Sequence, residues 1–309
     1  MHTDQSNHHS LGLGIDAGGT ATRWALAAPG GAIVAEGAVG GLSALQMATE
    51  AGRASVHATF AALAQAVLAQ GRPARVQAGL TGFGGDGAQM VGWLAELLGL
   101  AADAIVLGND IEIACRASFA PGEGYLVYAG TGSIGAFIDA DGVFHRAGGR
   151  GVVLDDGGGG FWIAREALRQ IWRKEDEQPG AWRASPMAHA VFDDIGGADW
   201  ALSRQFIYGG ERGAIGRLAL AVAVSAERDP AAAAILREAG RELGRLALAL
   251  VHRFGARPVL LAGRAAALHP LIADSMRSTL PPGIALTQSG LRPHHAAARL
   301  ALGAGAPSE

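Results

Sequence analysis

Two segments of this sequence join glycines to hydroxyl side chains directly after an apolar run. They are "DAGGTAT" at residues 16–22 and "AGTGS" at residues 129–133. Glycine lets backbone N–H groups approach a ligand closely, and Thr or Ser hydroxyls add further donors. Two such turns can hold a chain of phosphate groups without a lysine. The alternative interpretation is two tight β-hairpins built from common turn residues, with Asp16 capping the first turn.

The two turns also belong to a repeated pattern. The residues from Ala17 and those from Ala129 both show a strand end, a Gly/Thr/Ser turn, a strand, a glycine-bearing turn and another strand. One supersecondary unit is therefore used twice. This duplication favours a binding function for the turns over two unrelated hairpins.

Two residue types are scarce, and each scarcity excludes a group of functions. Lys174 is the single lysine, in a charged segment typical of a solvated surface. Walker-type phosphate loops, protein kinases, pyridoxal enzymes and Schiff-base enzymes all need a lysine in another context, and "GLGIDAGG" lacks the glycine spacing of a dinucleotide fingerprint. Cys115 is the single cysteine, which excludes an internal disulfide and a cysteine zinc site.

Net charge and hydropathy argue against two kinds of partner. The 309 residues carry a formal net charge of −3 and no cluster of Lys and Arg, so neither a nucleic acid nor a membrane surface is expected. No segment has the run of about 18 apolar residues that a membrane span needs, and the first ten residues lack an apolar signal core. We therefore expect a cytoplasmic protein.

Hydrophobic periodicity and turn residues predict mixed α/β structure around the two turns. In the first half, the elements predicted after the hairpins are a helix at 44–70, a strand at 75–82, a helix at 86–99 and a strand at 104–110. In the second half they are a helix at 159–172, an irregular segment at 175–186, helices up to 254, a strand at 258–263 and a helix at 294–303. Asp229 and Pro230 mark the start of the helix that ends at 254. Hinges are expected at 114–122 and near the C-terminus.

Five segments, in this order, resemble the signature segments of one family. They are "DAGGTAT" at 16–22, "GND" at 108–110, "AGTGS" at 129–133, "GGRGVVLDDGGGGFWIAREAL" at 148–168 and "LLAGRAAALHPL" at 260–271. Together they resemble the BadF/BadG/BcrA/BcrD ATPase family, which includes the N-acetylglucosamine and glucosamine kinases. That family belongs to the actin, sugar kinase and Hsp70 superfamily. The resemblance covers nearly the whole chain from Leu11 onward.

The resemblance implies a fold class and domain boundaries. It implies an α/β protein with two ribonuclease H-like (actin-like ATPase) domains, built on a duplicated β-β-β-α-β-α pattern, and a cleft between them. The first domain is expected at 11–116, with a C-terminal helix at 290–305 packing back on it. The second is expected at 117–289 and carries a helical insertion.

The resemblance also implies ATP and Mg²⁺ as cofactors. Asp16 is expected to hold the hydrated Mg²⁺, because this cation takes oxygen ligands and keeps several waters. Gly263 and Arg264 are expected at the adenosine, where Arg264 either stacks on the adenine or lies at the edge of the cleft. The residues expected at the ATP phosphates are Gly18, Gly19, Thr20, Thr22, Gly130, Thr131, Gly132 and Ser133.

Asp110 is the expected catalytic residue. It ends an apolar strand, where a parallel α/β sheet binds its ligand, and a base there can accept the proton of the acceptor hydroxyl during phosphoryl transfer. The alternative role is the N-cap of the following helix, and one residue can do both. The residues expected at the acceptor sugar are Asp110, Asp156, Gly149 and Ser43.

The sequence departs from the family pattern at the sugar. Within "LDDGGGGFW", Asp155 replaces a usual glycine, Gly157 a usual glutamate and Gly159 a usual serine. Four consecutive glycines also suit a flexible entry to the next helix. Leu45 stands where mammalian-type N-acetylglucosamine kinases have an asparagine that contacts the sugar, and its side chain forms no hydrogen bond.

The resulting prediction is ATP-dependent transfer of the γ-phosphoryl group to the primary hydroxyl of N-acetylglucosamine or a related amino sugar. A glucosamine kinase or another hexose kinase is an alternative, and so is a nucleotide-binding sensor without catalysis. An ATPase that activates 2-hydroxyacyl-CoA dehydratases is disfavoured, because its iron–sulfur cluster takes two cysteines from each chain. The expected partner is a small-molecule sugar, and a homodimer is left open.

Two neighbouring histidines and four tryptophans receive structural roles. His294 and His295 are assigned to the surface or to packing, because the sequence shows no third ligand at metal spacing. The tryptophans assigned to packing are Trp162, Trp172, Trp182 and Trp200.

Overall fold

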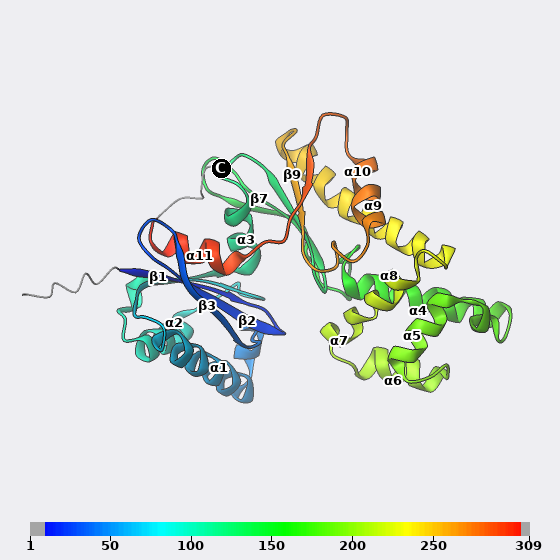
Figure 1. The fold of residues 1–309 in the computed structure, drawn as a ribbon, viewed down its shortest axis with the longest axis horizontal. Coiled ribbons are helices and arrows are strands. Elements are labelled where there is room, and N and C mark those ends of the chain that lie inside the picture. Colours follow the sequence, from blue (N-terminus) through cyan, green and yellow to red (C-terminus); the bar gives the residue numbers. More distant parts are fainter. Residues whose placement is uncertain (1–9, 304–309) are drawn as a thin grey trace, which may run out of the picture. The chain divides into compact units, whose positions relative to one another are not determined.

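The computed structural model describes residues 10–303, and the chain divides into two compact units. Unit 1 contains the chain up to residue 120 together with the part from residue 291 onward, and unit 2 contains residues 121–290. Each unit has its own five-stranded sheet and its own hydrophobic core (Figure 1). Within residues 10–303, no helix is long and apolar enough to cross a membrane.

The sheet of unit 1 has the strand order β3-β2-β1-β4-β5. The strands are β1 (Leu11–Ala17), β2 (Ala21–Ala27), β3 (Ile33–Gly40), β4 (Pro73–Leu80) and β5 (Ile105–Asn109). The pairs β1–β2 and β2–β3 are antiparallel, whereas β1, β4 and β5 run parallel. The carboxyl ends of β1, β4 and β5 therefore meet at one edge of the sheet.

Helices cover both faces of this sheet (Figure 1). On one face lie α1 (Glu50–Leu68) and α2 (Ala88–Leu98), and on the other lie α3 (Asp110–Ser118) and α11 (Pro293–Ala301). The short helices η1 (Ala44–Ala48) and η2 (Ala102–Ala104) precede α1 and β5. α11 lies directly on β1, because a Cβ atom on Gly14 would be 2.0 Å from the carbonyl oxygen of His294. A side chain at position 14 would push this helix away.

Unit 2 repeats the strand order as β8-β7-β6-β9-β10. Its strands are β6 (Tyr125–Ala129), β7 (Ser133–Ile138), β8 (Phe144–Gly148), β9 (Val259–Ala262) and β10 (Leu286–Gln288). Again the first three strands pair antiparallel, and β6, β9 and β10 run parallel. The predicted fold class, two α/β domains from one duplicated pattern, is confirmed.

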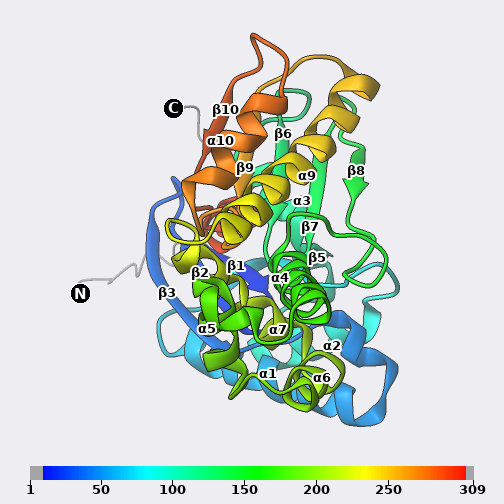
Figure 2. The same cartoon turned by 90° about the vertical axis from the view of Figure 1, so that its right-hand side faces the viewer.

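The helices of unit 2 lie mostly in the long connection from β8 to β9. They are α4 (Gly160–Glu177), η3 (Ala181–Ala184), α5 (Pro186–Ile195), α6 (Trp200–Gly209), α7 (Arg212–Arg217), α8 (Ala219–Ser225) and α9 (Pro230–Phe254). α9 contacts β6, β7 and β8, and α10 (Pro270–Thr279) lies beside it (Figure 2). As predicted, Asp229 caps α9, since its Oδ1 atom accepts the N–H of Ala231 at 2.9 Å.

Local structure differs from the sequence prediction in a few places. The segment 175–186 was expected to be irregular, but α4 continues to Glu177 and η3 follows, because the Glu175 carboxylate accepts the N–H groups of Gly180 and Trp182 and so holds the turn. Helix α10 and the short strand β10 were not predicted. The boundaries between the units, at residues 120/121 and 290/291, fall where hinges were expected, although the first part of the segment 114–122 belongs to α3, which extends to Ser118.

Candidate active site

Asp16 and Asp110 lie at the carboxyl ends of β1 and β5, the two parallel strands that flank β4 in unit 1. Asp16 on β1 is paired with Gly79 on β4, and Gly79 is paired with Gly108 on β5. Asp110 is the first residue of α3, directly after β5. A Cβ atom on Gly79 would be 3.0 Å from the Cα of Asp110, so the backbone of β4 leaves only enough space for a glycine beside this aspartate.

The two carboxyl groups influence each other electrostatically. Burial, with a further contribution from the charge of Asp110, raises the pKa of Asp16 to about 6, although Arg23 opposes the shift. Burial also raises the pKa of Asp110. Both shifts mean that the protein alone compensates the charged forms only in part. A hydrated Mg²⁺ suits this site, because it takes carboxylate oxygens and would offset the repulsion between the two charges.

Thr81 holds Asp110 in position. Its hydroxyl donates to the Oδ2 atom of Asp110 at 2.5 Å, while the Oδ1 atom accepts the N–H of Ile111 at 2.9 Å. Both hydrogen bonds lower the pKa of Asp110 and so oppose the effect of burial. Thr81 was missed at the sequence level, although its place at the end of the strand in "GLTG" is a usable signal.

The alternative role for Asp110, the N-cap of α3, belongs to its neighbour. Asn109 is the N-cap, and its Oδ1 atom accepts the N–H of Ile111 at 2.9 Å. The amide of Asn109 also donates to the carbonyl of Phe83. Asp110 is therefore not required to start this helix.

The first glycine turn joins β1 to β2. The N–H of Gly18 donates to the carbonyl of Ala21 at 3.1 Å, and Gly19 and Thr20 are exposed on the turn. Thr22 lies differently: it is fully buried on β2, and its hydroxyl has no hydrogen-bond partner among the described residues. Burial sets Thr22 apart from the exposed turn, and the phosphate roles of Gly18, Gly19, Thr20 and Thr22 stay predictions.

Ser43 lies beside Thr81 in unit 1. Its hydroxyl donates to the carbonyl of Thr81 at 3.1 Å and accepts the N–H of Leu45, which caps η1. Leu45 is 66% exposed, and a Cβ atom on Gly82 would be 2.7 Å from its Cγ. The structure thus brings Ser43 and Leu45 to the end of β4, close to the residue that holds Asp110.

The second glycine turn, in unit 2, is bound to the start of α4. The N–H groups of Gly160 and Phe161 donate to the carbonyls of Gly130 and Thr131 at 2.8 and 2.9 Å. The hydroxyl of Ser133 is buried and donates to the carbonyl of Gly157 at 2.6 Å. The Ser133 hydroxyl thus holds the turn against Gly157, and the phosphate roles of Gly130, Thr131, Gly132 and Ser133 stay predictions.

Asp156 lies against this second turn. It is buried with a left-handed backbone (φ 54°), which aspartate tolerates better than most residues. Its Oδ1 atom accepts the N–H of Gly151 at 3.0 Å, and a Cβ atom on Gly132 would be 2.1 Å from its Oδ2. Burial raises the pKa of Asp156. The predicted contact with sugar hydroxyls stays a prediction, as does that of Gly149, whose N–H donates to the carbonyl of Ser133.

The four glycines at 157–160 are buried and packed, so a flexible entry to α4 was the wrong interpretation. A Cβ atom on Gly158 would be 2.6 Å from the carbonyl oxygen of Ala239, and one on Gly159 would be 2.6 Å from the carbonyl carbon of Gly132. At Gly157 only the side chain of Glu242 is in the way. The serine that the family has at position 159 would not fit here without displacing the turn.

The segment expected at the adenosine also packs on the second turn. Gly263 follows β9 with φ +103°, and a Cβ atom there would be 2.3 Å from the carbonyl oxygen of Ala129. The N–H of Ala265 donates to the same carbonyl at 2.9 Å. Arg264 between them is exposed. Unit 2 thus assembles three motifs that are far apart in the sequence: the Gly130 turn, Asp156 and Gly263.

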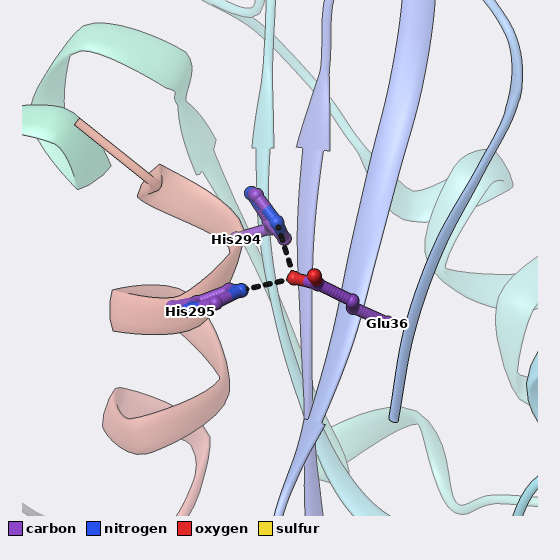
Figure 3. Close-up of side chains that lie close together, drawn as sticks. All are labelled: Glu36, His294 and His295. Carbon is purple, nitrogen blue, oxygen red and sulfur yellow. Dashed lines mark hydrogen bonds and ion pairs between the residues drawn. The ribbon is translucent and has the colours of Figure 1, made fainter. Parts of the chain in front are cut away.

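A second group of ligand-type side chains lies elsewhere in unit 1. Glu36, His294 and His295 each offer a ligand atom, and these atoms all lie within 4.8 Å of one another (Figure 3). The inference that the two histidines have no third ligand partner was wrong. It failed because Glu36 lies about 260 residues earlier in the chain.

The fold and this arrangement of motifs are those of two-domain sugar kinases and actin-like ATPases. The BadF/BadG/BcrA/BcrD ATPase family matches residues 13–278, and the chain belongs to this family. The resemblance found in the sequence is thereby confirmed. A comparison with curated proteins gives no match.

Solved structures agree with this assignment. A Chromobacterium violaceum protein assigned as an N-acetylglucosamine kinase is 25% identical, with a TM-score of 0.68 over 95% of this chain and 99% of its own. A Porphyromonas gingivalis protein with the same assignment is 18% identical, with a TM-score of 0.71 over 92% and 96%. A ROK family glucokinase from Streptomyces griseus, solved with glucose and AMPPNP, is 17% identical, with a TM-score of 0.60 over 96% and 99%. The last two likenesses show the fold alone.

Proposed function

We propose that this chain is an ATP-dependent carbohydrate kinase that phosphorylates the primary hydroxyl of an amino sugar. The observation that carries the proposal is the pair Asp16 and Asp110 at the ends of the two parallel strands that flank β4, with Thr81 hydrogen-bonded to Asp110. Membership of the ATPase family and the likeness to the Chromobacterium violaceum protein support this class of enzyme.

In the proposed reaction Asp110 is the general base. The acceptor hydroxyl gives its proton to the carboxylate, its oxygen forms a bond to the γ-phosphorus, and the bond from that phosphorus to the bridging oxygen breaks to leave ADP. Asp16 would hold Mg²⁺, which supplies positive charge to the phosphate oxygens. The Thr81 hydroxyl and the N–H of Ile111 each donate to one carboxylate oxygen of Asp110 and so fix its orientation, while each oxygen keeps a lone pair that can accept the proton.

Unit 2 supplies backbone groups rather than charge in this proposal. The turn at Gly130–Ser133 contributes to the phosphates and Gly263 with Arg264 to the adenosine, as the family resemblance implies. Support comes from their packing, since Gly263 and Ala265 both lie against the carbonyl of Ala129, next to the turn. Titration calorimetry with Mg-ATP and Mg-ADP tests the nucleotide part of the proposal by itself.

The acceptor is the finer part of the proposal. The 25% identical Chromobacterium violaceum protein supports an amino sugar. However, Leu45 and Gly157 lack the polar groups that the family places near the sugar, and such losses relax selectivity. We therefore expect a preference for glucosamine or N-acetylglucosamine over glucose of about tenfold or less.

A coupled assay of ADP release tests the acceptor, with N-acetylglucosamine, glucosamine, glucose and no acceptor compared at saturating Mg-ATP. A higher kcat/KM for either amino sugar supports the proposal. A higher value for glucose or a non-sugar acceptor would overturn the amino-sugar part and leave the kinase. Binding of ATP without ADP release on any acceptor would instead support the nucleotide-binding sensor.

Leu45→Asn sharpens the same test. Introducing the amide that mammalian-type N-acetylglucosamine kinases have at this position should raise the ratio of kcat/KM for N-acetylglucosamine over glucose about fivefold, because one added hydrogen bond is worth about 1 kcal/mol. Val143→Asn is the matched control, since Val143 is an exposed apolar residue of unit 2. An unchanged ratio in Leu45→Asn would place residue 45 outside the acceptor site.

A further inference from the structure

The cluster of Glu36, His294 and His295 joins two segments of unit 1. Glu36 lies on β3, the edge strand of the sheet, and both histidines lie in the first turn of α11 (Figure 3). The Nε2 atom of His295 is hydrogen-bonded to the Oε2 atom of Glu36, and the Nε2 atom of His294 is 3.5 Å from the same oxygen. Two imidazole nitrogens thus converge on one carboxylate oxygen.

The arrangement has the donor set of a transition-metal site. Two histidines and one carboxylate are a ligand combination that Zn²⁺ uses when it keeps a fourth position for water. The three ligand atoms lie within 4.8 Å of one another, and the two rings are nearly perpendicular at 77° with centroids 4.5 Å apart. Small rotations of the side chains would bring all three atoms to one metal ion.

Burial differs across the cluster in a way that suits such a site. His294 is only 7% exposed, and its Nδ1 atom has no hydrogen-bond partner among residues 10–303. The Nε2 atom of His294 is the one that faces Glu36, so a metal ion at the cluster would take this nitrogen. The Glu36 side chain is 48% exposed, so the fourth position of a bound ion would be open to water.

We propose that Glu36, His294 and His295 bind one Zn²⁺-type transition-metal ion that fastens α11 to the edge strand β3. This site is separate from the one proposed for Mg²⁺, because Mg²⁺ takes oxygen ligands and imidazole nitrogen selects softer ions. Binding would replace the hydrogen bond between His295 and Glu36 with bonds from both side chains to the ion.

Two arginines face the cluster and oppose a cation. Arg292 lies 3.5 Å from Glu36, and Arg23 is close enough to act on His294 electrostatically. The Arg292 side chain is 64% exposed, so it can turn into solvent when the ion binds. An exposed ion pair of this kind is weak, so a zinc site with three protein ligands outweighs it.

The position of α11 gives the site a consequence for the whole unit. This helix lies on β1, where the backbone of His294 leaves no room for a side chain at Gly14, and Asp16 follows two residues later on the same strand. An ion that holds the start of α11 would therefore stabilise the strand that carries Asp16. A thermal shift on zinc binding is the expected sign.

The test uses the full chain carrying His8→Ala and His9→Ala, since these histidines near the N-terminus could bind zinc themselves. After EDTA treatment and dialysis, we expect one equivalent of ZnCl₂ to bind in a competition titration with a chromophoric chelator. At 100-fold excess over Kd, Tm should rise by roughly 5 °C. Co²⁺ should give the visible absorption of a four- or five-coordinate site.

Glu36→Gln and His295→Ala, each in the same background, should weaken zinc binding by about 100-fold or more. His252→Ala, an exposed histidine of unit 2, is the control and should bind zinc unchanged. Tm values measured in EDTA show whether the variants fold, and His295→Gln replaces His295→Ala if it does not. Equal zinc affinity in the background and in Glu36→Gln, or no binding to either, would show the proposal to be wrong. Neither readout depends on kinase activity.

Discussion

The two units share one strand order but place different chemistry at the ends of the strands. In unit 1, β1 carries Asp16 one residue before Ala17, and Asp110 follows β5. In unit 2, the residue before the corresponding Ala129 is Tyr128, and β10 ends in Gln288. One scaffold thus presents carboxylates in unit 1 and an uncharged glycine turn in unit 2. The comparison teaches that a duplicated fold need not duplicate its charges.

The units also differ in the connection after their third strand. In unit 1 the connection from β3 to β4 holds η1 and α1, whereas in unit 2 the connection from β8 to β9 holds α4 to α9. The start of α4 packs on the second turn through Gly159 and Gly160. We infer that unit 1 acts through side-chain charge and unit 2 through the shape of its backbone, and variants in each unit test this difference.

Asp110→Asn should have the largest effect. Loss of the general base should lower kcat by about 10²- to 10⁴-fold with little change in ATP affinity, because Asn109 continues to cap α3. Steady-state kinetics and titration calorimetry measure the two quantities. Asp103→Asn, an exposed aspartate of unit 1, is the control. Turnover near that of the wild type would show that Asp110 is not the general base.

Gly159→Ala tests the backbone of unit 2. The added Cβ would be 2.6 Å from the carbonyl carbon of Gly132, so the turn must move, at a cost of about 1–3 kcal/mol in stability. We expect KM for ATP to rise about tenfold, with a smaller change in kcat. Gly209→Ala is the control, because nothing lies within 4 Å of that position. An unchanged KM for ATP would show that this turn does not bind the nucleotide.

Thr81→Val tests how unit 1 tunes its base. The Thr81 hydroxyl lowers the pKa of Asp110 against the effect of burial, so its removal should raise that pKa. Since the base works only when deprotonated, the acidic limb of the pH profile of kcat should move to higher pH. At pH 7 we expect a loss of about tenfold or less. Thr59→Val on α1 is the control, and an unmoved limb would contradict this role for Thr81.

The last prediction concerns the stability of Asp16→Asn, and its expected effect is the smallest of the four. The pKa of Asp16 is raised from 3.8 to about 6 in the folded protein, so its contribution to stability is full below pH 3.8 and is lost as pH rises through 6. Without Mg²⁺ and ATP, the neutral variant should therefore be more stable than the wild type at pH 8, by about 1 kcal/mol. Thermal unfolding in EDTA measures this, and the difference should vanish near pH 4. A variant less stable at pH 8 would show that the charge of Asp16 is compensated by its neighbours.

Much of the fold could be predicted because its signals are local. The repeated turns after Ala17 and Ala129, and the capped start of α9 at Asp229, depend on residues that are neighbours in the chain. The segment after α4 could not be predicted in this way, since Glu175 reaches forward to Gly180 and Trp182. Such side-chain contacts with the backbone leave no periodic pattern.

The candidate site, too, could be predicted from the sequence only in part. The residue types at Asp16, at Asp110 and in the glycine turns already indicated phosphate chemistry, because carboxylates at strand ends and glycine turns suit it wherever they occur. Only the tertiary structure showed that Thr22 is buried and that Thr81 holds Asp110. Strand alternation and register decide which hydroxyl faces the site and which faces the core.

The sequence by itself determined the family, the class of chemistry and most of the strands and helices, since these depend on short-range patterns. The tertiary structure alone decided which distant residues meet: Asp156 with Gly132, and Glu36 with His294 and His295. The physical reason is that such contacts depend on how sheets and helices pack. Glu36 and His295 are 259 residues apart, so no local sequence pattern indicates that they meet.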